Sequence, residues 1–210
     1  HNVVLSIYFN SEKNAVKVNS LPPPALKADQ LPTHTHQITH WEAYTGNLEK
    51  ITESASMAGH FNPIVDSDGT VRKLPLLVEY GGNFYQSLSL AMVRMAIQAS
   101  SDYEKLEGLQ IGPLQIPLQE DASAFVPYRG GPHTYRYISV SDLLNNRLPP
   151  NALENKLVLM GSSAPGLRDQ RATPMASVYP GIEVHANMIS GILNDEIRTA
   201  PAYTCLLYTS

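Results

Sequence analysis

Apolar runs separated by polar segments predict several short β-strands. Residues 3–9 read VVLSIYF and residues 156–161 read KLVLMG. Both runs are short and rich in β-branched or aliphatic residues, so each predicts a buried strand, most clearly at residues 156–161. Three further strands are predicted, at residues 109–116, 124–129 and 135–140.

Helical spacing is present in two longer segments. Phe84, Leu88 and Met92 recur on one face, which predicts an amphipathic helix over residues 84–99 with Asn83 as its cap. A final helix is predicted over residues 182–194. A short helix is also predicted, capped by Ser139 or Ser141 and running through Leu144. Alternating strands and helices predict a mixed α/β fold, with a largely parallel sheet covered by helices.

The Asp68-Gly69 pair predicts a β-hairpin, with residues 74–80 as the returning strand. Asp66 and Asp68 also resemble the start of a calcium loop. The glutamate that such a loop needs six residues after the glycine is replaced by Pro75, so a turn is favoured over a metal site.

Composition is that of a folded globular chain. Of its 210 residues, 43% are hydrophobic and 16% are charged, and the net charge is -4. With only 15 lysines and arginines and no basic run, nucleic acid is not an expected partner. Cys205 is the only cysteine, so no intramolecular disulfide is possible. We expect one domain over residues 1–203, followed by a tail at 204–210 that derives from cloning.

The order of several short motifs carries a resemblance to a known family. The motifs are Gly59–Asn62, Asp66–Arg72, Gln86–Ala91, Pro127–Gly130, Tyr137–Leu144, Leu157–Ala164, Asp169, Thr173-Pro174 and Pro180–Asn187. In this order they resemble the CHASE domain of the second type, a cyclase- and histidine-kinase-associated sensory extracellular domain. The resemblance covers roughly residues 55–200.

The resemblance implies an extracytoplasmic location, periplasmic or extracellular, between membrane helices of a bacterial signalling protein. It also implies an intracellular output such as an adenylate or guanylate cyclase or a histidine kinase. The family normally has a sizeable segment before the strand at residues 3–9, and this chain does not show it. We therefore expect a domain that is partial at its N-terminus, whose sheet lacks strands or exposes an edge that pairs with another chain.

The segment after the predicted strand at 156–161 is the first candidate ligand site. Small residues at the carboxyl end of a strand let backbone N–H groups approach an anion. The alternative is a tight strand exit, with Asp169 pairing with an arginine to hold the loop. The candidate ligand-binding residues here are Ser162, Ser163, Asp169, Arg171 and Thr173.

His185 and Asn187 lie on the predicted final helix and form the second candidate group. A histidine between Ile182 and Ile189 is either a hydrogen-bonded core residue or a ligand-binding or pH-sensing group. The third group is Asp66, Asp68 and Arg72 at the predicted hairpin.

His34, His36 and His40 share parity, so on an extended strand they would face one side. Neutral imidazoles suit zinc, copper or nickel. The polyproline residues 22–24 nearby favour a loop over a metal site, and we expect no cofactor.

Three functional hypotheses follow. The first is a sensor domain without catalytic residues, which binds an unknown small molecule or periplasmic partner and forms a homodimer in the full-length protein. The second is a soluble α/β hydrolase-like enzyme that uses Ser163, Asp169 and His185. It lacks the glycine after the serine that a nucleophile elbow requires. The third is a structural spacer that binds no ligand.

Overall fold

The computed structural model describes residues 2–12, 18–27, 38–98, 108–162 and 169–198. His34, His36, Ser163 and residues 204–210 lie outside these ranges, so the predictions that rest on them have no structural counterpart. His40, the third histidine of the candidate metal group, is described.

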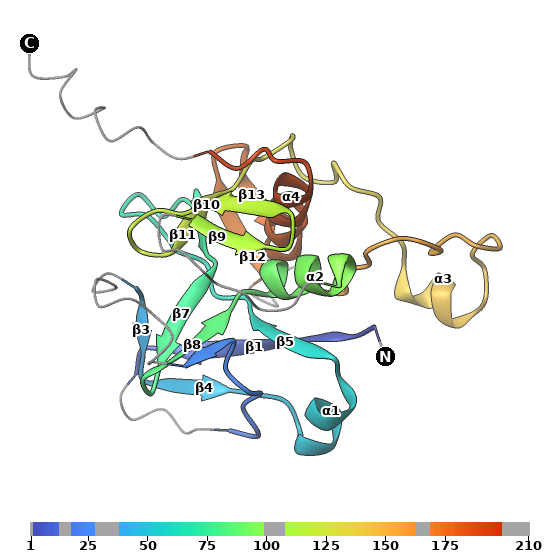
Figure 1. Ribbon diagram of the computed structural model, residues 1–210. Coiled ribbons are helices and arrows are strands. Elements are labelled where there is room, and N and C mark those ends of the chain that lie inside the picture. The colour runs from blue at the N-terminus through green and yellow to red at the C-terminus, as the bar shows by residue number, and fades with distance from the viewer. Residues whose placement is uncertain (1, 13–17, 28–37, 99–107, 163–168, 199–210) are drawn as a thin grey trace, which may run out of the picture.

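The described residues form a mixed α/β fold, which confirms the predicted class (Figure 1). The helices are α1 (Glu49–Ser54), α2 (Leu88–Ile97), α3 (Val140–Leu144) and α4 (Gly181–Leu193). The strands are β1 (Val4–Asn10), β2 (Leu26–Lys27), β3 (His40–Trp41), β4 (Ala43–Thr45), β5 (Met57–His60), β6 (Lys73–Pro75), β7 (Leu77–Tyr80), β8 (Asn83–Gln86), β9 (Gly108–Ile111), β10 (Leu114–Pro117), β11 (Ser123–Phe125), β12 (Gln170–Thr173) and β13 (Ala176–Pro180).

The sheets are small and less parallel than predicted. The two larger sheets have the orders β4-β1-β5 and β2-β8-β7-β3. Parallel pairing among the described strands is limited to β1 with β5 and β3 with β7, whereas the other ladders are antiparallel. The physical reason is that short turns connect many consecutive strands, and a short turn can join only antiparallel neighbours.

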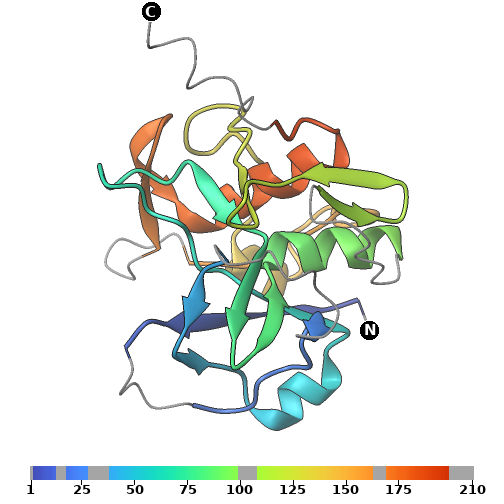
Figure 2. The same ribbon diagram turned by 60° about the vertical axis from the view of Figure 1, so that its left-hand side comes forward.

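Helix α2 lies between the sheets of the N-terminal half and helix α4, as both views show (Figures 1 and 2). The main hydrophobic core forms around it from Leu90 and Val93 of α2, Met188 and Ile192 of α4, and the strands nearby. A second, smaller core gathers Ile7, Phe9, Val78 and Tyr85 on the other side of β1.

The predicted helix over residues 84–99 begins later than expected. Phe84 and Tyr85 belong to β8, which pairs with β7 through the turn at Gly81-Gly82. Ser87 then caps α2 by accepting a hydrogen bond from the backbone of Leu90 at 3.2 Å, so Asn83 is not the cap. Aromatic residues favour strands, and pairing with β7 here overrides the helical spacing.

Two predicted strands are absent from the described residues. Residues 135–140 form no strand before α3, which Ser139 caps as predicted. Residues 156–161 belong to no helix or strand, and Val158 and Met160 are 54% and 80% exposed. The clearest strand signal in the sequence therefore has no strand partner here.

The strand at β1, the final helix α4 and the turn at Asp68-Gly69 are confirmed. The turn joins Ile64 to Lys73 by a single antiparallel bridge, and the returning strand is split into β6 and β7. Pro75 is accommodated in β6 opposite Ser123.

Candidate functional site

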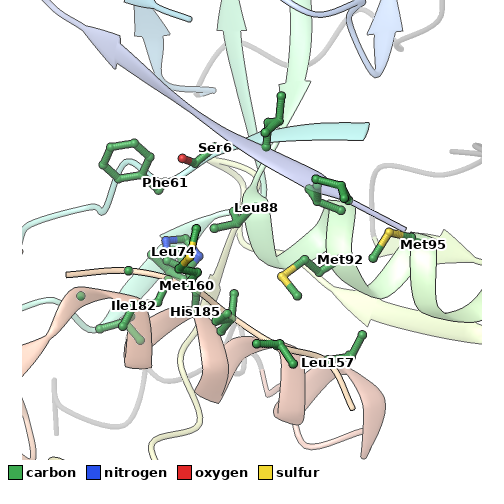
Figure 3. A pocket seen from close by; sticks show the side chains of 18 of the residues that line it. Ser6, Phe61, Leu74, Leu88, Met92, Met95, Leu157, Met160, Ile182 and His185 are labelled. Carbon is green, nitrogen blue, oxygen red and sulfur yellow. The ribbon is translucent and has the colours of Figure 1, made fainter. Parts of the chain in front are cut away.

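A cleft of about 1030 Å³ opens between β1, α2, α4 and the segment at residues 156–162 (Figure 3). Its α2 wall carries Leu88, Met92 and Met95, which are spaced at helical intervals. Ser6 and Phe61 lie on one side of the cleft, and Ile182 and His185 of α4 lie on the other. The lining therefore combines apolar side chains with polar ones, and four of the polar residues, Ser162, Asp169, Arg171 and His185, lie on or near the start of α4.

Asp169 lines the cleft and fastens the chain to the start of α4. Its backbone carbonyl accepts a hydrogen bond from Gly181 at 2.6 Å, and its side chain is hydrogen-bonded to the backbone of Ile182. Burial raises the pKa of Asp169, while Arg171 and the Ile182 N–H oppose the shift. A Cβ at Gly181 would lie 2.3 Å from the Asp169 carboxylate, so this contact requires glycine. Asp169 is thus held by a helix N-terminus, where a negative charge is favoured.

Arg171 and Ser162 also line the cleft and are half-buried. Arg171 lies near enough to Asp169 to influence its pKa, but the two side chains form no ion pair within 4.0 Å. The predicted pairing of Asp169 with an arginine is therefore not made by Arg171. Arg168 lies outside the described residues.

His185 lines the cleft from α4 and is 4% exposed. Its Nδ1 lies 2.8 Å from the hydroxyl of Ser89 on α2, and its ring is also hydrogen-bonded to the backbone of Phe61. Burial lowers the pKa of His185 to about 4, and the bond to Phe61 opposes that shift. His185 therefore joins α4 to α2 and to the end of β5.

His60 lies beside His185 and is fully buried. Neither of its ring nitrogens has a hydrogen-bond partner among the described residues. Burial lowers the pKa of His60 to about 3, and the neighbouring His185 adds to the effect. The close approach of β5 to α2 depends on Gly59, because a Cβ there would lie 2.5 Å from the Ser87 backbone.

The remaining candidates on the C-terminal elements do not line the cleft. The hydroxyl of Thr173 accepts hydrogen bonds from the backbones of Met175 and Ala176, which closes the turn between β12 and β13. The side chain of Asn187 is fully buried; its oxygen accepts from the Arg129 backbone, and its amide donates to Tyr179 and to the Glu183 carbonyl. Thr173 and Asn187 therefore stabilise the segments that surround them.

Asp66, Asp68 and Arg72 lie together at the hairpin, away from the cleft lining. The guanidinium of Arg72 donates to both carboxylates, at 2.7 Å to Asp66 and at 2.7 and 3.0 Å to Asp68. Asp68 also accepts from the backbone of Thr70 at 3.0 Å. Arg72, with the Thr70 N–H, holds the pKa of Asp68 well below its usual range. The carboxylates are thus occupied by an arginine in the turn.

The side chain of His40 contacts glutamate carboxylates rather than other histidines. Its ring lies against Glu79, and its Nε2 is 3.6 Å from Glu42. Hydrogen bonding to Glu79 is the main cause that raises the pKa of His40. Over the described ranges, no cluster of three histidine, cysteine or acidic side chains has the arrangement of a metal site.

Several cleft and neighbouring residues were missed by sequence reasoning. The spacing of Leu88, Met92 and Met95 marked one helix face, but nothing along the chain showed that this face would border a cleft. Ser89 and His60 carry no local signal, since Ser89 bonds to His185, 96 positions away, and His60 only lies beside that histidine. Only the packing of α2 against α4 and β5 brings these groups together.

Comparison with known proteins decides the family. The model of the CHASE2 domain matches residues 2–208, nearly the whole chain. The chain belongs to the CHASE2 family. No curated protein and no solved structure matches it.

CHASE2 domains are sensory extracellular domains, so family membership places this chain in signal transduction rather than catalysis. An extracytoplasmic location is consistent with that membership. Among the helices that the structure describes, none has the length and apolar character needed to cross a bilayer.

Proposed function

We propose that this CHASE2 domain is the extracytoplasmic sensor of a bacterial transmembrane protein with a cyclase or histidine-kinase output, and that its signal binds in the cleft. The full-length protein acts as a homodimer in this proposal. The observation that carries it is that four polar residues line the cleft near the start of α4, beside apolar side chains of α2 and α4. These residues are Ser162, Asp169, Arg171 and His185.

The arrangement around the cleft supports a route from binding to a change in structure. Asp169 holds the N-terminus of α4, and His185 holds α4 against α2. A ligand that contacts either residue would favour one position of α4 over another. A differential affinity for two states is what shifts a conformational equilibrium.

The two rival hypotheses receive less support. A hydrolase would need Asp169 to orient His185, yet Asp169 is bonded to the backbone of Ile182 and His185 to Ser89. A spacer predicts no pocket with converging polar groups, whereas the cleft has them.

A thermal-shift screen of the purified chain tests the proposal against metals, nucleotides, amino acids, sugars and small carboxylates. A ligand at about 100 times its dissociation constant adds about 2.7 kcal/mol to the stability. We expect Arg171→Ala to abolish the shift and Arg147→Ala to leave it unchanged. Arg147 is a suitable control because it lies outside the cleft and its side chain is 66% exposed. A shift that survives Arg171→Ala would contradict binding at this site.

A further inference from the structure

No described strand covers the outer edge of β1 at Val4 and Ser6, where β1 borders the cleft. In the parallel ladder with β5, the carbonyls of Val3 and Ile7 accept hydrogen bonds from Met57 and Phe61. Because neighbouring residues of a strand direct their backbone groups to opposite sides, those of Val4 and Ser6 point away from β5. Strand β4 pairs with β1 only from Tyr8 onward, so it does not cover this stretch.

One backbone group on this edge is capped by a side chain. Asn47 donates its side-chain amide to the carbonyl of Ser6 at 2.8 Å. The N–H and carbonyl of Val4 and the N–H of Ser6 have no protein partner among the described residues. An edge with free backbone groups is a template for pairing with another strand.

The opposite side of the cleft is bordered by a second unpaired segment. Residues 157–161 belong to no helix or strand, and no backbone hydrogen bond joins them to another part of the described chain. Leu157 and Val158 are 39% and 54% exposed despite lying in the most strand-like run of the sequence. Gly161 approaches Ile182 so closely that a Cβ would lie 3.0 Å from its side chain, which keeps the end of the segment against α4.

The floor between these two segments is apolar. Met92 and Leu88 of α2 line the cleft below β1, and Ile182 of α4 lines it farther along, beyond Leu74 and Met160 (Figure 3). A strand lying between β1 and residues 157–161 would place alternate side chains on this floor, as strands of an α/β sheet do on their covering helices.

We propose that the cleft binds an extended polypeptide segment as an added β-strand, hydrogen-bonded to Val4 and Ser6 on one side and to residues 157–161 on the other. The segment continues the sheet β4-β1-β5 into the cleft. Its side chains are aliphatic at the alternate positions that face α2 and α4, and polar at the end near Asp169 and Arg171. The inference rests on the proposed sensory cleft and identifies its partner as a peptide strand rather than a small molecule.

Backbone complementarity decides between these two kinds of ligand. A small molecule would fill the apolar floor but leave the strand-like segments on both sides unpaired. Main-chain hydrogen bonding in strand addition supplies affinity, while alternate side-chain pockets supply specificity. The cleft offers both features, since the β1 backbone has groups without a partner in the described part of the chain, and methionine and leucine side chains of α2 lie nearby.

A fluorescein-labelled octapeptide of sequence KTVIVVTK is a suitable probe, with binding to the 210-residue chain followed by fluorescence anisotropy. The control peptide is N-methylated at alternate residues, which removes donors along one edge and leaves the side chains unchanged. We expect the N-methylated peptide to bind at least about tenfold more weakly, the equivalent of about 1.4 kcal/mol.

Two variants of the chain make the same test from the protein side. Ser6→Pro removes an outward N–H at an exposed position, whereas Ser6→Thr keeps it. We expect about a tenfold loss of affinity for Ser6→Pro and less than about a twofold change for Ser6→Thr. Circular dichroism checks that both variants fold. If Ser6→Pro does not fold, the comparison of the octapeptide with its N-methylated control still tests strand addition.

Absence of binding up to about 1 mM peptide, or equal binding of the N-methylated control, overturns strand addition. In that case, a small molecule that raises the thermal stability of the chain, but not that of the Arg171→Ala variant, would still support the proposed sensory role of the cleft. Conversely, peptide binding that leaves the output of the full-length signalling protein unchanged supports strand addition and contradicts the sensory role.

Discussion

Helix α4 and the segment from α3 to residue 161 are both rich in apolar residues, yet most apolar side chains of α4 are buried and most of those in the segment are exposed. Met188 of α4 is fully buried, and α4 packs against α2. By contrast, α3 has no buried residue, and its Leu144 is 76% exposed. Figure 1 shows α3 projecting from the body that contains α4. The difference teaches that an apolar segment is buried only when the fold supplies a facing surface.

The two regions are connected through buried polar groups on α4. The carboxylate of Glu183, 2% exposed, accepts from the backbones of His133 and Tyr135 at 3.0 and 3.2 Å and from the hydroxyl of Tyr137 at 2.9 Å. These bonds fix the chain just before α3. The projecting segment is therefore held at its start, although most of its apolar side chains, Leu159 excepted, are exposed.

The largest effect is expected from Glu183→Ala. It leaves two backbone donors and a tyrosine hydroxyl without their acceptor, which should lower the free energy of unfolding by about 3–5 kcal/mol. Urea denaturation measures the change. Glu196→Ala is the matched control, because Glu196 forms an exposed pair with Arg129 and should cost less than about 1 kcal/mol. Equal losses for the two variants would contradict a fastening role for Glu183.

The buried face of α4 gives the next largest effect. Met188→Ala removes a fully buried side chain from the core and should destabilise the chain by about 3 kcal/mol. Met160→Ala should change stability by less than about 0.5 kcal/mol, since that side chain is 80% exposed. Thermal and urea unfolding of both variants compare the same substitution in the two regions. Similar losses of unfolding free energy in the two variants would mean that residues 156–161 are packed in solution.

Acid should weaken the junction between β5, α2 and α4. Burial lowers the pKa of His60 to about 3 and of His185 to about 4, from 6.5 for a free histidine. Since the unfolded chain binds protons first, the stability that these histidines contribute is complete above pH 6.5. It then declines toward pH 4, by up to about 1.4 kcal/mol per pH unit for each residue.

Unfolding by urea at several pH values measures this slope. The double variant His60→Leu/His185→Gln should have a shallower slope between pH 6.5 and 4.5. In this variant the glutamine can still hydrogen-bond Ser89. An unchanged slope would show that other groups cause the acid sensitivity.

The smallest effect is expected for Leu144→Ser on α3. Loss of an exposed leucine should change the free energy of unfolding by less than about 0.5 kcal/mol. The comparison is sharpened if the same variant changes the dimerisation of the full-length protein, measured by analytical ultracentrifugation. A loss above about 1 kcal/mol in the isolated chain would show that α3 packs against the body.

Local patterns were sufficient for β1, α4 and the turn at Asp68-Gly69. In each, the signal lies within one element: a short apolar run, a helical stripe, or residues suited to a tight turn. The class of the fold follows from the alternation of such elements. The order of motifs also identified the family, although no single motif did so.

Long-range contacts decided the rest. Phe84 and Tyr85 join β8 because β7 lies beside them, and Asp169 caps α4 because the turn between β12 and β13 returns it there. The sequence by itself determined which segments are apolar and that Ser139 caps α3. Only the tertiary structure decided that residues 157–161 border an open cleft and that His185 meets Ser89. Strand pairing and burial depend on which partners the chain brings together, and that information is not contained in the segment itself.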